Sequence, residues 1–144
     1  PGRIEAYDIA HLGGSNAVGA LVVAENSEFK KSDYRKFKVI HGADDLANLR
    51  EVLTRRLVHT EWPRPDLIVV DGGRNQLAVA RAAVAAGGRR IPIVAVVKDA
   101  RHQPARLIGA PALIRRHRDL ILRLNHEAHR FAISFHRHRL RRLT

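Results

Sequence analysis

The chain has 144 residues, enough to bury one hydrophobic core but too few for two substantial ones, so we expect a single domain. Its 45% hydrophobic content argues against disorder, and no apolar run approaches the length that crosses a bilayer, so it should be soluble. The absence of cysteine excludes disulfides, thiolate metal sites and cysteine nucleophiles. A formal net charge of +12 favours a polyanionic partner, nucleic acid before an anionic membrane surface, although solubility alone can also explain an Arg-rich surface.

The first predicted elements are three strands that form an antiparallel meander. Residues 4–9 and 17–24 have the composition of extended apolar strands, and a Gly-rich turn over residues 13–16 separates them as in a hairpin. Residues 34–40 alternate aromatic or aliphatic side chains with cations, a pattern typical of a strand with one solvent-exposed, basic face.

A helix and a buried strand follow the meander. Asp44 can cap a helix over residues 45–58, in which leucine and valine recur at helical spacing. Residues 67–70 are a short, uninterrupted apolar run that ends in Asp71 and two glycines. This is the pattern of a buried parallel strand with a polar C-terminal tip.

The remaining elements are two helices and one clear strand. The alanine-rich segment 75–86 predicts a helix that stops at two glycines, and residues 91–97 predict a fifth strand. Residues 99–112 are hard to interpret, with only 106–108 hinting at a short strand. Beyond Pro111, apolar residues at helical spacing predict one long amphipathic helix that runs into a basic tail.

The order β-β-β-α-β-α-β-α resembles that of the ribonuclease H-like fold, so we predict an α/β domain with a mixed five-stranded sheet and flanking helices. A right-handed crossover would return the fourth strand beside the first and parallel to it. Asp8, near the end of the first strand, and Asp71, at the end of the fourth, would then lie side by side. They would lie at the edge where ligand sites of open α/β sheets gather.

Asp8, Asp71 and His129 are the residues that we expect to carry chemistry. Two neighbouring carboxylates repel each other unless a cation lies between them, so the aspartates favour a site for a hard divalent ion such as Mg²⁺ or Mn²⁺. His129 lies one step from the apolar stripe of the long helix, where a neutral imidazole can bind the same ion or transfer a proton. Each residue also has a structural interpretation: a turn for Asp71, a loop cap for Asp8 and a satisfied border histidine for His129.

Six segments, in their order and spacing, together resemble the C-terminal endonuclease domain of the UvrC family and cover nearly the whole chain. They are residues 3–11, 31–37, 44–46, 53–56, 70–76 and 127–137. The resemblance implies a metal-dependent endonuclease that acts in the cytoplasm on damaged double-stranded DNA. It would make the 5′ incision of nucleotide excision repair, after damage recognition by UvrA and UvrB.

The resemblance also implies roles for individual residues. Asp8 and Asp71 match the first and second catalytic aspartates of the family, and His129 matches its catalytic histidine, so that all three would hold Mg²⁺ or Mn²⁺. Asp45 matches a further family aspartate, although at the start of a helix it can equally be a cap. The residues expected to line a groove that tracks DNA phosphates are Tyr34, Arg35, Arg56, Lys98, Arg130 and Arg137.

The sequence departs from the family pattern at Ala10, at Arg74-Asn75 and at Asn125-His126, none of which is a metal candidate. Residues 99–112 lack a clear match to the hairpin of the family. We expect the chain to be a segment of a longer protein, because it begins with Pro1 and does not include the helix-hairpin-helix module of full-length relatives. Two alternatives stay open: a catalytically silent nucleic-acid-binding module on the same fold, and a structure-specific nuclease such as a junction resolvase.

Overall fold

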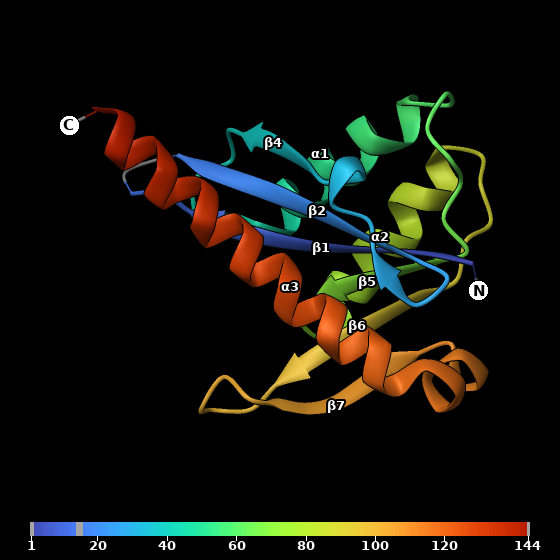
Figure 1. The fold of residues 1–144 in the computed structure, drawn as a ribbon. Coiled ribbons are helices and arrows are strands. Elements are labelled where there is room, and N and C mark those ends of the chain that lie inside the picture. Colours follow the sequence, from blue (N-terminus) through green and yellow to red (C-terminus); the bar gives the residue numbers. More distant parts are fainter. Residues whose placement is uncertain (1, 14–15, 144) are drawn as a thin grey trace.

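A computed structural model of the protein describes residues 2–13 and 16–143, without the side chains of residues 105 and 135–143. Within these residues, seven strands form one sheet, three α-helices cover its faces (Figure 1), and no helix is long and apolar enough to cross a membrane. The strands are β1 (Arg3–His11), β2 (Ala17–Glu25), β3 (Glu28–Phe29), β4 (Arg35–Val39), β5 (Leu67–Asp71), β6 (Ile93–Lys98) and β7 (Pro104–Gly109). The helices are α1 (Asp45–Val58), α2 (Arg74–Ala86), α3 (Pro111–Leu143) and the short 3₁₀ helix η1 (Lys31–Asp33).

The strand order confirms the predicted ribonuclease H-like sheet. The order is β3-β2-β1-β5-β6-β7, and β4 pairs with β2 next to β3. β1 pairs with β2 in antiparallel and with β5 in parallel orientation. The strand predicted as the fourth therefore does return beside the first, and the sheet is mixed.

The sheet has seven strands rather than the predicted five. β3 is only two residues long, and β7 pairs with β6 in an antiparallel hairpin within the segment that was hard to interpret. β7 lies at the edge of the sheet, starts with Pro104 and exposes Arg106, so it lacks the apolar pattern of a central strand. The segment therefore forms a hairpin with β6, which its sequence only hinted at through residues 106–108.

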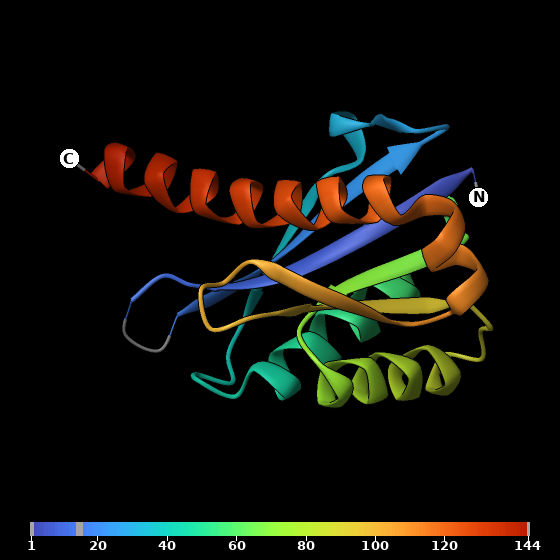
Figure 2. The ribbon, with the colours of Figure 1, turned by 90° about the horizontal axis from the view of Figure 1, so that it is seen from below.

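The sheet lies between two helical layers, with α1 and α2 on one face and α3 on the other (Figure 2). Successive side chains of a strand point to opposite faces. Ala6 of β1 and Val69 of β5 belong to the hydrophobic cluster under α3. Asp8 and Asp71 follow two residues later on the same strands, so both face the α3 side.

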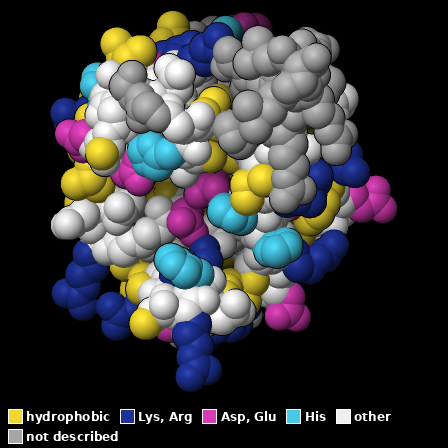
Figure 3. Space-filling view, turned by 90° about the vertical axis from the view of Figure 1, so that its left-hand side faces the viewer, with side chains coloured by type: hydrophobic (Ala, Val, Ile, Leu, Met, Phe, Trp, Pro, Cys, Tyr) yellow, Lys and Arg dark blue, Asp and Glu magenta, His cyan; other side chains and the backbone are white. Residues whose placement is uncertain are grey.

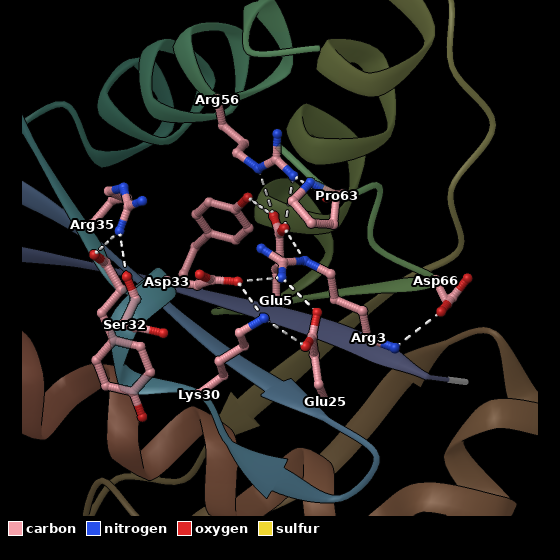
Figure 4. A network of polar contacts seen from close by, with 12 residues as sticks. Arg3, Glu5, Glu25, Lys30, Ser32, Asp33, Arg35, Arg56, Pro63 and Asp66 are labelled. Atoms are coloured by element: carbon pink, nitrogen blue, oxygen red, sulfur yellow. Dashed lines mark hydrogen bonds and ion pairs between the residues drawn. The ribbon is translucent and has the colours of Figure 1, made fainter. Parts of the chain in front are cut away.

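A buried network of charged side chains lies on the other face, beneath α1 (Figure 4). Glu5 and Arg56 have no exposed surface, and Arg56 donates from Nε and Nη2 to the two oxygens of Glu5 over 2.8 and 2.7 Å. Arg56 Nη2 also donates to the Pro63 carbonyl, and the Tyr7 hydroxyl and Arg3 Nε donate to Glu5. A guanidinium enclosed in this way has no exposed surface, so the structure does not place Arg56 on the wall of a groove as expected.

Candidate active site

Asp8 and Asp71 lie side by side at the C-terminal ends of two parallel strands. Tyr7 pairs with Val70 in the β1–β5 register, so the residues that follow them are neighbours across the two strands. Asp8 is only 7% exposed. Burial first, and repulsion from Asp71 second, raise the pKa of Asp8 from 3.8 to about 6, against the opposing effect of His129 and Lys98. The protein's own cations therefore compensate the charge of the pair only in part.

Lys98 from β6 and Asn125 from α3 hold the Asp71 carboxylate. Lys98 Nζ donates to Asp71 Oδ1 and, over 2.7 Å, to Asn125 Oδ1, while Asn125 Nδ2 donates to Asp71 Oδ1 over 3.2 Å. Lys98 thus belongs to the carboxylate site rather than to a separate groove. In the sequence, Asn125 stood out only as a departure from the family pattern. It lies four residues before His129, so both are on one face of the helix, and this spacing could have identified Asn125 as a residue of the site.

His129 reaches the site from α3 and contacts the other carboxylate. Its Nδ1 lies 3.1 Å from Asp8 Oδ2, and its side chain is 64% exposed. A carboxylate at one ring nitrogen orients an imidazole and leaves the second nitrogen available for a ligand or a proton. The three residues expected to form the site are therefore brought together from β1, β5 and α3.

A third carboxylate, Asp45, lines a small cavity together with Asp8 and Asp71. Asp44 is the residue that caps α1, because its Oδ1 accepts from the Ala47 backbone N–H over 3.1 Å. Asp45 Oδ1 instead lies 2.8 Å from His11 Nε2. The cavity beside the aspartates has a volume of about 110 Å³ and is lined by Tyr7, Asp8, Ile9, Asp45, Leu49, Asp71, Gly72 and Gln76.

The turn after β5 requires a glycine and thereby positions Asp71. Gly72 has a φ of +129°, and a Cβ there would come within 2.5 Å of the Gln76 side chain. Gln76 is held in place because its Oε1 accepts from the Gly73 backbone N–H over 2.9 Å. The backbone that follows Asp71 is therefore packed closely against the first turn of α2.

Figure 3 looks onto the edge toward which β1 and β5 run, and it shows acidic side chains in a hollow with histidines around them. Asp8 and Asp71 supply oxygen donors and His129 supplies nitrogen. Among the residues that the structure describes, however, no group of three or more His, Asp or Glu side chains stands ready to hold a metal ion. Lys98 contacts Asp71 and His129 contacts Asp8 instead.

The remaining residues expected at DNA lie on or near β4 and α3. Tyr34 is 8% exposed, and its hydroxyl donates to Glu127 Oε2 over 2.8 Å. Arg35 is half-buried and donates to two backbone carbonyls. Arg130 has a half-exposed side chain that pairs with Glu127. Arg137 lies on α3, with its side chain outside the described residues.

The sheet order, with two aspartates at the ends of adjacent parallel strands, is that of a ribonuclease H-like fold. The chain belongs to the family described as the UvrC RNAse H endonuclease domain, whose model matches residues 1–133.

Named proteins that are similar in sequence to this chain point to the same family. The chain is 42% identical over 144 residues to UvrABC system protein C of Caldicellulosiruptor saccharolyticus, covering 94% of this chain and 24% of the relative. It is 41% identical over 150 residues to the protein of that name from Acidobacterium capsulatum, covering 96% and 23%. The chain thus spans about a quarter of the length of these relatives. The crystal structure of human ENDOV has a TM-score of 0.49 and 19% identity, covering 67% of this chain and 45% of that chain.

Proposed function

We propose that this domain is a divalent-metal-dependent DNA endonuclease that makes the 5′ incision of nucleotide excision repair. The observation that carries the proposal is the pair of Asp8 and Asp71, which face α3 from adjacent strands and repel each other, because neighbouring cations compensate their negative charge only in part. Membership of the UvrC endonuclease family supports the nuclease activity. The relatives' name, UvrABC system protein C, supports UvrA and UvrB as partners and damaged duplex DNA as the substrate.

Asp8 and Asp71, with His129, are the residues that would hold Mg²⁺ or Mn²⁺. Carboxylate oxygens and an imidazole nitrogen suit these ions. Repulsion from Asp71, which together with burial raises the pKa of Asp8, supports a positive charge beside the pair. When bound, such an ion supplies polarisation of a phosphoryl oxygen and a more acidic water.

The chain's own residues have distinct tasks in this proposal. His129 is oriented by Asp8 through one ring nitrogen, and with the other it either binds the ion or accepts and returns a proton at the reacting oxygen. The Lys98 ammonium places a positive charge beside Asp71, where negative charge develops on the phosphate. Asn125 fixes both Lys98 and Asp71 and acts as a positioning residue.

The test is an incision assay in which only the 5′ cut is scored. Because the chain spans about a quarter of its relatives, it replaces the corresponding segment of its 42%-identical relative, and the chimera is supplied with UvrA and UvrB. The substrate is a damaged duplex already nicked on the 3′ side of the lesion, assayed with Mn²⁺, Mg²⁺ or EDTA. Asp71→Asn is compared with Asp119→Asn, which removes one exposed carboxylate of α3 outside the cavity.

We expect Asp71→Asn to abolish the 5′ cut while DNA binding persists, and Asp119→Asn to cut as the unaltered protein does. EDTA should stop cutting in every sample. If Asp71→Asn cuts at the normal rate, Asp71 is not part of the catalytic site. If the unaltered chimera makes no 5′ cut, the silent binding module becomes the better interpretation. Cutting that continues in EDTA would exclude the divalent ion.

A further inference from the structure

The N-terminal part of α3 lines a second cavity, at the end of the sheet opposite to the carboxylates. This cavity has a volume of about 330 Å³ and is lined by Ser27, Arg115, Arg116, His117, Arg118, Asp119, Leu120 and Arg123. Ser27 lies in the turn that joins β2 to β3, and the end of β2 pairs with the start of β1. Asp8 and Asp71 lie instead toward the C-terminal ends of β1 and β5. A ligand in this cavity is therefore distinct from one at the candidate active site.

A bend in α3 places arginines from both of its sides in this cavity. His117 has a φ of −124° and a ψ of 21°, so the regular helix is interrupted at this residue. Successive residues of an undistorted helix are rotated by about 100°, so Arg116 and Arg118 would point about 160° apart. With the bend between them, both line the same cavity as Arg115. Burial lowers the pKa of His117, so the imidazole adds no charge of its own near neutral pH.

The charges of these arginines are left uncompensated. Among the residues that the structure describes, no acceptor or aromatic ring contacts the guanidinium groups of Arg115, Arg116 and Arg118, and all three residues are exposed. The described lining of the cavity contains four arginines and one carboxylate, Asp119, which leaves an excess of three positive charges. Like charges gathered in one cavity repel each other. A bound anion would relieve this repulsion and accept hydrogen bonds from the guanidinium groups.

The exposed side of α3 leads from this cavity to the active site without an exposed carboxylate. Residues 120–128 are all described, and the exposed ones among them are Arg123 and His126. Glu127 is the acidic residue of this stretch, and it is only 6% exposed. His129, the next exposed residue, reaches Asp8. A polyanion that lies along this part of α3 would therefore meet no exposed negative charge of the helix.

The length of α3 between the two places sets the size of the ligand. Figure 1 shows that α3 runs across the sheet, and Arg118 precedes His129 by eleven residues, which is about 16 Å along the axis at 1.5 Å per residue. A single phosphate does not span this distance. The phosphates of one DNA strand repeat every ~3.4 Å along the duplex axis, so about five base pairs do span it. Guanidinium groups bind phosphate oxygens through pairs of N–H donors, so a DNA backbone fits both the charge and the length of this surface.

We propose that Arg115, Arg116 and Arg118, with Arg123 beside them, bind backbone phosphates of the DNA arm that lies about five base pairs away from the incised bond. The inference rests on the proposed function, because it takes DNA as the ligand and the carboxylates as the place of the cut. The duplex would lie along α3, so that the incised bond is at the carboxylates and one flank is held by the arginines. The arginines contact phosphates and no base, so they hold this flank whatever its sequence.

The test measures binding of a fluorescent duplex by anisotropy, in EDTA and at several salt concentrations. The duplex is long enough to reach from the carboxylates to the arginines. The α3 triple variant carries Arg115→Gln, Arg116→Gln and Arg118→Gln and keeps Arg123, whose guanidinium packs over the Phe29 ring at 5.3 Å. The matched control replaces three exposed arginines outside α3 by glutamine, and these are Arg50, Arg81 and Arg90. Both triple variants change exposed residues only, so their melting temperatures should stay near that of the unaltered protein.

Each lost phosphate contact makes the slope of log K against log salt shallower by about 0.9, so three lost contacts change it by about 2.7. We therefore expect the α3 triple variant to bind at least about tenfold more weakly near physiological salt, with the control losing much less. The proposal is overturned if the α3 triple variant binds with the affinity and slope of the unaltered protein, or if the control loses as much. If Asp71→Asn still abolishes cutting in that case, the endonuclease proposal stands without this site.

Discussion

Replacing Arg56 by methionine tests whether this residue supports the fold or contacts DNA. The Arg56 guanidinium makes two charge-assisted hydrogen bonds to Glu5 and one to the Pro63 carbonyl, and neither charged side chain has exposed surface. Methionine fills the space of the stem but leaves the Glu5 carboxylate, among the residues that the structure describes, with Arg3 as its one cationic partner. Removing one member of a buried ion pair costs about 3 to 4 kcal/mol of unfolding free energy.

The expected shift in melting temperature follows from the size of the chain. An unfolding entropy of about 2.1 cal/mol/K per residue gives about 300 cal/mol/K for 144 residues. A loss of about 3 to 4 kcal/mol therefore lowers the Tm by about 10 to 13 °C. Thermal unfolding followed by circular dichroism measures this shift, and the duplex-binding assay, run well below the new Tm, measures affinity.

Two further variants sharpen the comparison. Arg50→Met removes an exposed cation of the same helix and should change stability by less than about 0.5 kcal/mol. Glu5→Gln combined with Arg56→Met removes both charges, so the double variant should lose less than the two single losses combined. The reasoning is refuted if Arg56→Met melts within about 3 °C of the unaltered protein while its affinity for DNA falls as for a phosphate contact.

Three other outcomes are expected at the carboxylate site. Gly72→Ala should lower the incision rate by about tenfold or more, because the new Cβ must displace Gln76 and with it the backbone beside Asp71. Asn125→Ala should lower incision by about tenfold and raise the metal concentration that gives half-maximal cutting, and an unchanged metal titration would contradict its positioning role. In EDTA, the raised pKa of Asp8 means that the native state binds its proton more tightly than the unfolded chain does. Melting temperature should therefore fall, relative to Asp8→Asn, as pH rises from 3.8 to about 6, and equal pH profiles of the two proteins would refute this.

Much of the fold could be predicted because it depends on local patterns. Leucines and valines at helical spacing after Asp44 predicted α1 at its observed bounds, Asp45–Val58, with Asp44 as its cap. The apolar run before Asp71 predicted a buried parallel strand, and β5 is that strand. The edge strand β3 escaped prediction, and β7 was only hinted at by residues 106–108, because a strand paired on one side needs less apolar surface and its pattern is correspondingly weak.

The candidate site was predictable only as far as strand ends and helix faces allow. Asp8, Asp71 and His129 could be placed together because parallel neighbours end at one edge and the long helix must cover that face. The bonds of Asn125 to Asp71 depend on how α3 crosses the sheet, which no local pattern contains.

By itself the sequence determined the composition, the order of the elements, the carboxylates at the strand ends and the basic character of the chain. Only the tertiary structure decided whether each cation is buried or exposed and which groups it contacts. Arg56 is buried against Glu5, whereas Arg130 pairs with Glu127 and has a half-exposed side chain. The physical reason is that a charge in a sequence carries no record of its surroundings. Burial and partners from distant segments set whether it stabilises the fold or remains available to bind a ligand.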